Sequence, residues 1–174
     1  MGIKRGLVVG RFQPYHRGHH EAVKNILGEM DELVIAVGST EQSHEIDNPF
    51  TAGERVEMIA MALKADGIYE RCYIVPVPDI REYALWVNRV RSYCPHFDVV
   101  YTNNPLVREL FSAENIEVRK MASGVKEVES SAIRKAFQNG NKWEDLVPKS
   151  VREFLEKIGA QARIMALIEE EKKE

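Results

Sequence analysis

Residues 7–20 read LVVGRFQPYHRGHH, and this stretch decides the fold. The apolar run LVV at its start predicts a short buried strand. Gly10 ends that run, a loop containing Pro14 follows, and residues 18–30 have the apolar spacing of a helix. A strand, a glycine-bearing loop and a helix N-terminus together predict the first half of a βαβ unit.

Basic and imidazole side chains crowd the start of this helix. They are Arg11, His16, Arg17, His19 and His20. A helix N-terminus also presents unpaired backbone N–H groups and the positive end of its dipole. We therefore expect a site for anionic oxygens, and phosphate is the ligand that this chemistry favours.

The histidines have two other interpretations, metal binding and chance. The HxxHH spacing can hold a metal ion, but no cysteine lies nearby to complete a zinc shell. The histidines could also be scattered by chance. However, three of the five histidines lie within five positions directly after a strand, which chance explains poorly. The phosphate interpretation is favoured, and we expect no metal ion held by these side chains.

Composition limits the class of protein. The chain has 174 residues, which suffices for one domain with a full core. We expect a single domain over 1–174, with about 150–174 as a C-terminal helical extension. A net charge of −3 argues against a nucleic-acid-binding surface. No apolar run is long enough to span a membrane, and two isolated cysteines indicate a cytoplasmic protein.

Strand-like runs alternate with helical patterns along the chain. Further strands are predicted at 33–37, 72–75, 98–101 and 116–118. This alternation predicts an α/β fold, a doubly wound, Rossmann-like parallel sheet of about five strands with helices on both faces and a helical C-terminus. Loops 10–17, 39–50, 78–86 and 102–105 all follow strands, so they should meet at the rim where such sheets bind ligands.

Local signals mark several helix starts. Thr51 and Glu54 fit a capping box, as do Ser150 and Glu153. The pair Ser130-Ser131 is expected to cap another helix. Residues 121–129 have no clear periodicity and predict a mobile loop. The chain has no GxxxxGK[ST], GxGxxG or GxSxG motif, so positioning and electrostatics at a phosphate site remain the expected chemistry.

The string HRGH at 16–19 matches the HxGH motif of the nucleotidyltransferase superfamily. The longer GRFQPYHRGHH closely resembles the archaeal type of nicotinamide-mononucleotide adenylyltransferase. So do GSTEQSHEIDNPFTAGER, DIREYALWV and TNNPLVRELF. ESSAIR at 129–134 is a looser match to the second motif, ISSTxxR. The similarity covers residues 6–148.

The resemblance implies an activity. The AMP moiety of ATP would pass to nicotinamide mononucleotide (NMN) by direct in-line attack on the α-phosphate, giving NAD⁺ and pyrophosphate. Mg²⁺ is expected on the ATP phosphates. The alternatives are the same chemistry on phosphopantetheine, choline phosphate or FMN, and a non-catalytic nucleotide-binding regulator. A homo-oligomer is also implied, for which a hexamer is one candidate.

The resemblance also implies site residues. The expected catalytic residues are His16, His19, Arg11 and Arg134. The expected ATP-binding residues are Gly10, Arg11, Phe12, His16, Gly18, His19, Asn104, Ser131 and Arg134. The expected NMN-binding residues are Phe12, Gln13, Ser39, Asp79, Ile80 and Trp86.

Two of these assignments have simpler alternatives, and the sequence departs from the family at two places. Arg134 could be an ordinary surface arginine, and Trp86 a buried aromatic of a helix stripe. Asp47 stands where family members often carry arginine, so one possible phosphate contact is missing. Thr102-Asn103 replaces a common Ser-Gly pair, which leaves the contacts of that loop open.

Overall fold

A parallel sheet forms the centre of the molecule. The computed structural model describes residues 2–122 and 128–173, and in this part five strands lie in the order β3-β2-β1-β4-β5. The strands are β1 (Arg5–Gly10), β2 (Glu32–Val37), β3 (Cys72–Pro76), β4 (Val99–Tyr101) and β5 (Glu117–Arg119). Every neighbouring pair is parallel, which confirms the predicted fold class.

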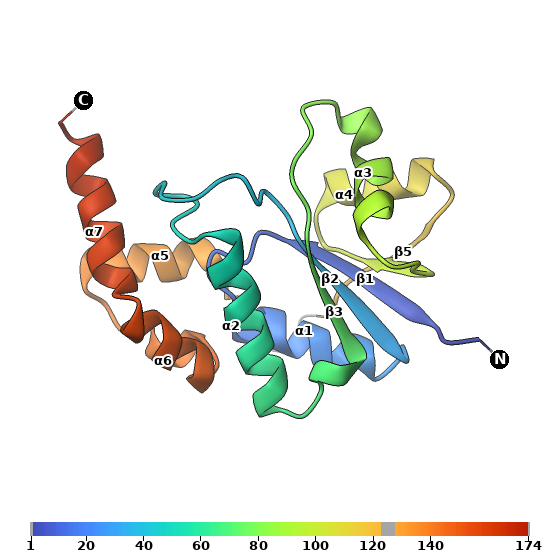
Figure 1. Cartoon of the computed structure of the whole chain (residues 1–174), viewed down its shortest axis with the longest axis horizontal. Coiled ribbons are helices and arrows are strands. Elements are labelled where there is room, and N and C mark those ends of the chain that lie inside the picture. Colours follow the sequence, from blue (N-terminus) through green and yellow to red (C-terminus); the bar gives the residue numbers. More distant parts are fainter. Residues whose placement is uncertain (1, 123–127, 174) are drawn as a thin grey trace.

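Helices cover both faces of this sheet (Figure 1). They are α1 (Arg17–Leu27), α2 (Ala52–Ala65), α3 (Trp86–Tyr93), α4 (Pro105–Ala113), α5 (Ser130–Asn139), α6 (Lys149–Lys157) and α7 (Ala160–Glu171). The pair α1 and α2 lies on one face, and the pair α3 and α4 lies on the other. None of the helices in the described ranges is both long and apolar enough to cross a membrane.

The central strands are apolar throughout because both of their faces are buried. In β2, Leu33, Ile35 and Val37 pack into the cluster beneath α1 and α2. The alternate residues Val34 and Ala36 pack into the cluster beneath α3 and α4. Successive side chains of a strand point to opposite faces, so a doubly covered strand has no polar phase.

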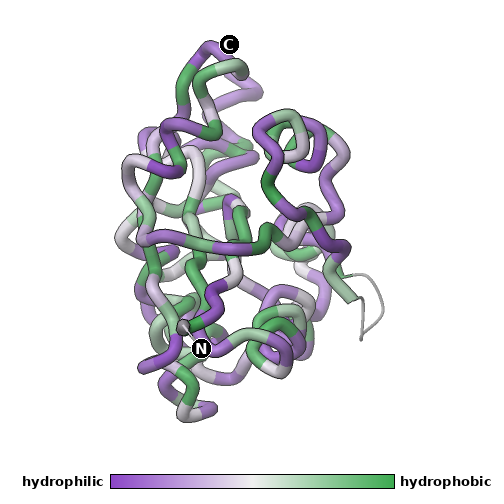
Figure 2. Tube along the Cα trace, turned by 90° about the vertical axis from the view of Figure 1, so that its right-hand side faces the viewer, coloured by the Kyte–Doolittle hydropathy of each residue, from purple (hydrophilic) through white to green (hydrophobic). Residues whose placement is uncertain are grey.

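The last three helices extend the α1–α2 layer. Apolar residues of α6 and α7, among them Phe154, Leu155 and Ile164, belong to the same buried cluster as α2. Hydrophilic (purple) and hydrophobic (green) positions both occur along α7, the helix that leads to the C-terminus (Figure 2). Arg163 of α7 donates to both carboxylate oxygens of Glu54 at 2.7 Å, a paired geometry that fixes α7 beside the start of α2.

The structure corrects two predicted helix caps. The box at Thr51 and Glu54 is present. Ser130, however, is already inside α5 and its hydroxyl donates to the Pro14 carbonyl at 2.9 Å. The box at Ser150 is also wrong, because α6 begins at Lys149 with Pro148 as its N-cap, and Ser150 makes no cap bond. Residues 123–127 of the predicted mobile loop lie outside the described residues.

The strand order creates one switch point. From β1 the chain proceeds through β2 to β3 on one side, and then returns to β4 and β5 on the other. The loops after β1 and β4 therefore separate at the carboxyl ends of these strands, which is where doubly wound sheets bind ligands.

Candidate active site

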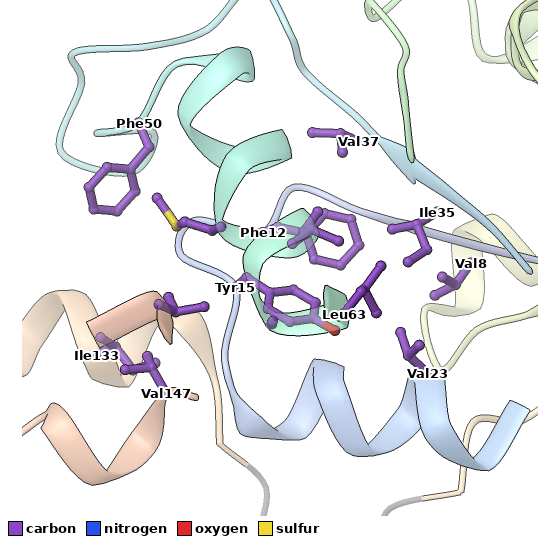
Figure 3. Close-up of a cluster of buried hydrophobic side chains, with 14 of the residues drawn as sticks. Val8, Phe12, Tyr15, Val23, Ile35, Val37, Phe50, Leu63, Ile133 and Val147 are labelled. Carbon is purple, nitrogen blue, oxygen red and sulfur yellow. The ribbon is translucent and has the colours of Figure 1, made fainter. Parts of the chain in front are cut away.

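The loop after β1 is held by an aromatic side chain that turns back into the core. Phe12 has a left-handed backbone, with φ of 52°, and is 2% exposed. Its ring lies with Tyr15 between α1 and α2, near Val23 and Leu63 (Figure 3). A Cβ at Gly10 would come within 2.9 Å of the Phe12 ring, so only glycine leaves room for this packing.

Two of the predicted histidines cap the helix that carries them. His16 is the N-cap of α1, and its Nδ1 accepts the backbone N–H of His19 at 3.2 Å. The Nδ1 of His19 accepts the backbone N–H of His16 at 3.3 Å. The two rings stack with their centroids 3.5 Å apart. This is a capping box in which imidazoles replace the usual Ser and Glu.

The cap also determines where each imidazole carries its proton. Because both Nδ1 atoms accept a backbone N–H, the hydrogen of each neutral ring must be on Nε2. Burial lowers the pKa of His16 to about 4. Burial and the neighbouring His16 ring lower the pKa of His19 well below its usual value. Near neutral pH both rings are therefore uncharged and have Nε2–H as their donor.

A cavity of about 580 Å³ opens over this pair at the switch point. Predicted residues His16, Gly18, His19 and Asn104 line it together with Phe12. Asn104 is the N-cap of α4 and its Oδ1 already accepts two backbone N–H groups, from Leu106 and Val107. The other walls, which the sequence did not predict, are Val8, Ala22, Val23, Asn103, Met121, Ala122, Val128, Glu129 and Ser130.

A smaller pocket of about 230 Å³ adjoins this cavity and shares Phe12 and His19 with it. It brings His19 of α1 and Arg11 of the loop after β1 together with Ser131 and Arg134 of α5, which follows much later in the sequence. Donors from three elements thus face one space of a size that suits phosphate groups. The Ser131 hydroxyl donates to Glu129 at 2.9 Å.

Arg134 is not an ordinary surface arginine. Its side chain is 9% exposed. One Nη donates to the Gln13 carbonyl at 3.0 Å and the other to Asp47 at 2.8 Å. Asp47 was expected only to remove a phosphate contact. Instead its carboxylate, which is 76% exposed, pairs with the guanidinium that was predicted to bind phosphate.

Two of the basic residues predicted to crowd this place lie elsewhere. Arg17 donates through Nε to the Val147 carbonyl at 3.2 Å. His20 is hydrogen-bonded to the Tyr15 hydroxyl at 3.1 Å and to Asp66 at 3.0 Å, away from the cavity. Residues one position apart in a helix point in different directions, so sequence proximity overestimated the cluster.

Of the residues predicted for NMN, the structure brings Ser39 and Asp79 together, just after β2 and β3. The Ser39 hydroxyl donates to Asp79 at 2.6 Å. The Trp86 ring is half-buried and meets Phe111 edge-on, with centroids 5.6 Å apart. The Gln13 side chain exchanges two hydrogen bonds with the Phe50 backbone. Both ends of the Gln13 amide are therefore hydrogen-bonded within the protein. Ile80, which follows Asp79 in the sequence, is half-buried.

Sequence reasoning missed Arg55. This residue is fully buried on the inner face of α2, where Met58, Ile59 and Ala62 are its neighbours in the helical phase. Its guanidinium donates to the carbonyls of Arg11, Gly38 and Ser39. A charged residue in the apolar phase of a helix was the signal that could have revealed it.

Among the described residues, no group of three or more His, Cys, Asp or Glu side chains is placed to hold a metal ion.

The fold and the site define a class. Paired HxGH histidines at a helix N-terminus, beside a cavity at the switch point of a doubly wound sheet, indicate a nucleotidyltransferase. The chain belongs to the cytidylyltransferase-like family, whose model matches residues 7–136.

Relatives narrow the class further. The chain is 46% identical over 165 residues to a nicotinamide-nucleotide adenylyltransferase of Thermococcus onnurineus, covering 94% of this chain and 88% of that protein. It is 48% identical over 166 residues to one of Archaeoglobus fulgidus, covering 92% and 95%. These relatives do not favour the alternative hypothesis that the chain is a non-catalytic nucleotide-binding regulator.

A solved structure has the same fold. It is a bifunctional NMN adenylyltransferase/ADP ribose pyrophosphatase from Francisella tularensis, complexed with AMP and a manganese ion, with a TM-score of 0.82 and 21% identity. The match covers 99% of this chain and 54% of that chain, so this protein spans about half of its length.

The histidine pair predicts a dependence of stability on pH. In the unfolded chain His16 titrates near 6.5, but in the folded protein its pKa is about 4. Between these values the unfolded state binds more protons, so the free energy of unfolding falls as pH is lowered, by up to about 3 kcal/mol. Denaturant titrations near pH 7 and at about pH 5 should show about 2 kcal/mol of this loss, because the rest appears only as the pH approaches the folded pKa.

A matched variant isolates the contribution of His16. Asn also serves as an N-cap but does not titrate, so His16→Asn should keep α1 capped and reduce the loss of stability at acid pH. An unchanged pH dependence in this variant would contradict the assignment.

Proposed function

We propose that the protein transfers the AMP moiety of ATP to NMN, forming NAD⁺ and releasing pyrophosphate. The observation that carries this proposal is the pair His16 and His19, which line the cavity with both Nδ1 atoms engaged in the helix cap, in a chain 46% identical to a nicotinamide-nucleotide adenylyltransferase.

The roles follow from where each group lies. We assign the adenosine and α-phosphate of ATP to the large cavity and its outer phosphates to the pocket of Arg11, Ser131 and Arg134. In this assignment the histidines donate hydrogen bonds to phosphate oxygens as neutral groups, and the two arginines supply the positive charge. Preorganised donors of this kind stabilise the charge that develops during transfer.

The reaction needs no covalent intermediate with the protein. A phosphate oxygen of NMN attacks the α-phosphorus in line, the bond to the α–β bridging oxygen breaks, and pyrophosphate leaves with the electron pair. Mg²⁺ carried by the ATP phosphates would neutralise part of their charge. The protein then has to align two phosphorylated molecules, which is consistent with two groups of residues around one rim.

On the acceptor side, we assign NMN to the space near Phe12, Ser39 and Asp79, with Ile80 and Trp86 on the following segment. The hydrogen-bonded pair Ser39–Asp79 supports this assignment, because it offers polar groups at the strand ends beside the ATP cavity. We also propose that the protein acts in the cytoplasm as a homo-oligomer, with a hexamer as the candidate assembly.

A product assay tests the proposal directly. The protein is incubated with ATP, Mg²⁺ and NMN, and in parallel with phosphopantetheine, choline phosphate or FMN. We expect NAD⁺ and pyrophosphate in equal amounts and NMN as the preferred acceptor. If another acceptor were turned over preferentially, it would replace NMN as the assigned substrate. If no acceptor led to the release of pyrophosphate, the proposal would be contradicted.

His19 should be required for the chemical step. His19→Ala removes an Nε2–H donor to the phosphates and should lower kcat by about 10²–10³-fold. His96→Ala is a suitable control, because that side chain is 83% exposed just before β4, at the amino ends of the strands and away from the cavity. Near-normal turnover by a folded His19→Ala protein would exclude this role.

Asp47 should weaken the binding of ATP. Its carboxylate competes with the triphosphate for Arg134, so Asp47→Asn should lower the KM for ATP by roughly two- to fivefold, the scale of an exposed ion pair. Steady-state kinetics at low and high salt measure the effect, which should shrink as salt increases.

Glu57→Gln controls for the change in net charge, since Glu57 is exposed on α2. If both variants lower the KM equally, long-range charge is responsible and competition at Arg134 is not.

A further inference from the structure

The least exposed charged group in the described part of the chain is the guanidinium of Arg55, with 0% exposure. It has no carboxylate as a hydrogen-bond partner among the described residues and donates only to backbone carbonyls. Nε donates to Thr51 at 3.2 Å and Nη2 to Ser39 at 3.0 Å, while Nη1 donates to Arg11 at 3.0 Å and Gly38 at 2.7 Å. Burial lowers the pKa of Arg55. A buried charge is costly, so the position needs an explanation.

Three of the four acceptors belong to two different loops, and the fourth is the carbonyl of Thr51, the N-cap of α2 itself. Arg11 follows β1, and Gly38 and Ser39 follow β2. Between these strand ends the backbone contributes one bond, from Gly38 N to Gly10 O at 2.9 Å. Arg55 therefore joins the two loops just beyond the point where the sheet stops holding them together.

Both loops contain a strained residue at this junction. Phe12 has φ of 52° and Ser39 has φ of 51°, the left-handed region that side chains other than Gly, Asn and Asp rarely adopt. Arg55 binds the carbonyl just before Phe12 and the carbonyl of Ser39 itself. Strained residues persist when the surrounding structure holds them, and they cluster at functional sites.

A planar group with several N–H donors suits this task. The guanidinium can donate in several fixed directions at once, whereas a lysine ammonium is a point charge on a flexible stem. The conformation of Ser39 in turn directs its hydroxyl to Asp79, at 2.6 Å. A chain of contacts therefore runs from α2 through Ser39 to the polar pair assigned to the acceptor.

We propose that Arg55 is a positioning residue for the acceptor: by clamping the loops after β1 and β2 it holds Phe12 and Ser39 in their left-handed conformations and so aligns the Ser39–Asp79 pair with NMN. This inference rests on the proposed function, because it takes the Ser39–Asp79 pair as part of the acceptor site.

The first test is Arg55→Lys, which keeps the charge and removes the planar fork. The KM for NMN should rise roughly 10- to 100-fold, as for a site displaced by about 1 Å, and the KM for ATP should change much less. Arg71→Lys is the matched control. Arg71 also donates to three carbonyls, those of Leu27, Met30 and Asp31, but near the start of β2. It should lower the melting temperature without changing the ratio of the two KM values.

The second test uses the strain itself. Ser39→Ala and Ser39→Gly both remove the hydroxyl, but only glycine adopts a positive φ readily. In the Arg55→Lys background, Ser39→Gly should give a lower KM for NMN than Ser39→Ala. With Arg55 intact, the clamp holds both backbones and the two KM values should agree. This last comparison does not require a folded Arg55 variant.

The outcomes distinguish a failure of the proposed function from a failure of the role assigned to Arg55. If the wild-type protein does not convert NMN, the proposed function fails. If it does, three results overturn the role of Arg55: equal changes in both KM values, a lower melting temperature as the only effect of Arg55→Lys, or unequal KM values for the two Ser39 variants when Arg55 is intact.

Discussion

The reciprocal hydrogen bonds between His16 and His19 are the interaction on which the site depends. The same two bonds start α1, orient both rings and assign their protons to Nε2. Helix initiation and ligand chemistry are thus performed by one pair of side chains. A serine or aspartate would cap the helix as well, but would place no N–H donor above the end of β1.

Burial gives this pair its chemical character. Two imidazolium rings stacked at 3.5 Å would repel each other, and burial weakens the screening of that repulsion by water. Both rings stay neutral, and positive charge is supplied by guanidinium groups that do not titrate near neutral pH. The division between neutral donors and permanent cations gives the site one charge state over the physiological range.

The sequence predicted the fold well because the signals for it are local and redundant. Strand β2 reads LVIAV with no polar phase, and Thr51 and Glu54 mark the start of α2 by their spacing alone. The caps assigned to Ser130 and Ser150 failed because both residues lie within the first turn of their helices. A hydroxyl one residue past the N-cap can bind another partner, as Ser130 does with the Pro14 carbonyl.

The arrangement of the candidate site was predictable where a motif specifies it, and less so where distant segments meet. The spacing of His16, Gly18 and His19 predicted that they would lie together, and all three line the larger cavity. The pairing of Asp47 with Arg134 joins residues 87 positions apart, and the carbonyls bound by Arg55 belong to two loops. No local pattern records such contacts, because they exist only after the sheet has brought the loops together. The contacts that Arg17 and His20 make were missed for the same reason.

The ion pair between Arg163 of α7 and Glu54 of α2 connects the last helix to the residues that support the candidate site. Arg163 donates to Glu54, and Glu54 accepts the backbone N–H of Thr51. Arg55 lies in the same helical turn and donates to the Thr51 carbonyl. No α7 side chain lines either cavity described above. Substitutions in α7 can nevertheless change the positions of the loops around the site, because Arg163 and Glu54 connect α7 to the start of α2. A homologue with a different final helix would need another cation beside Glu54 to keep the same loop geometry.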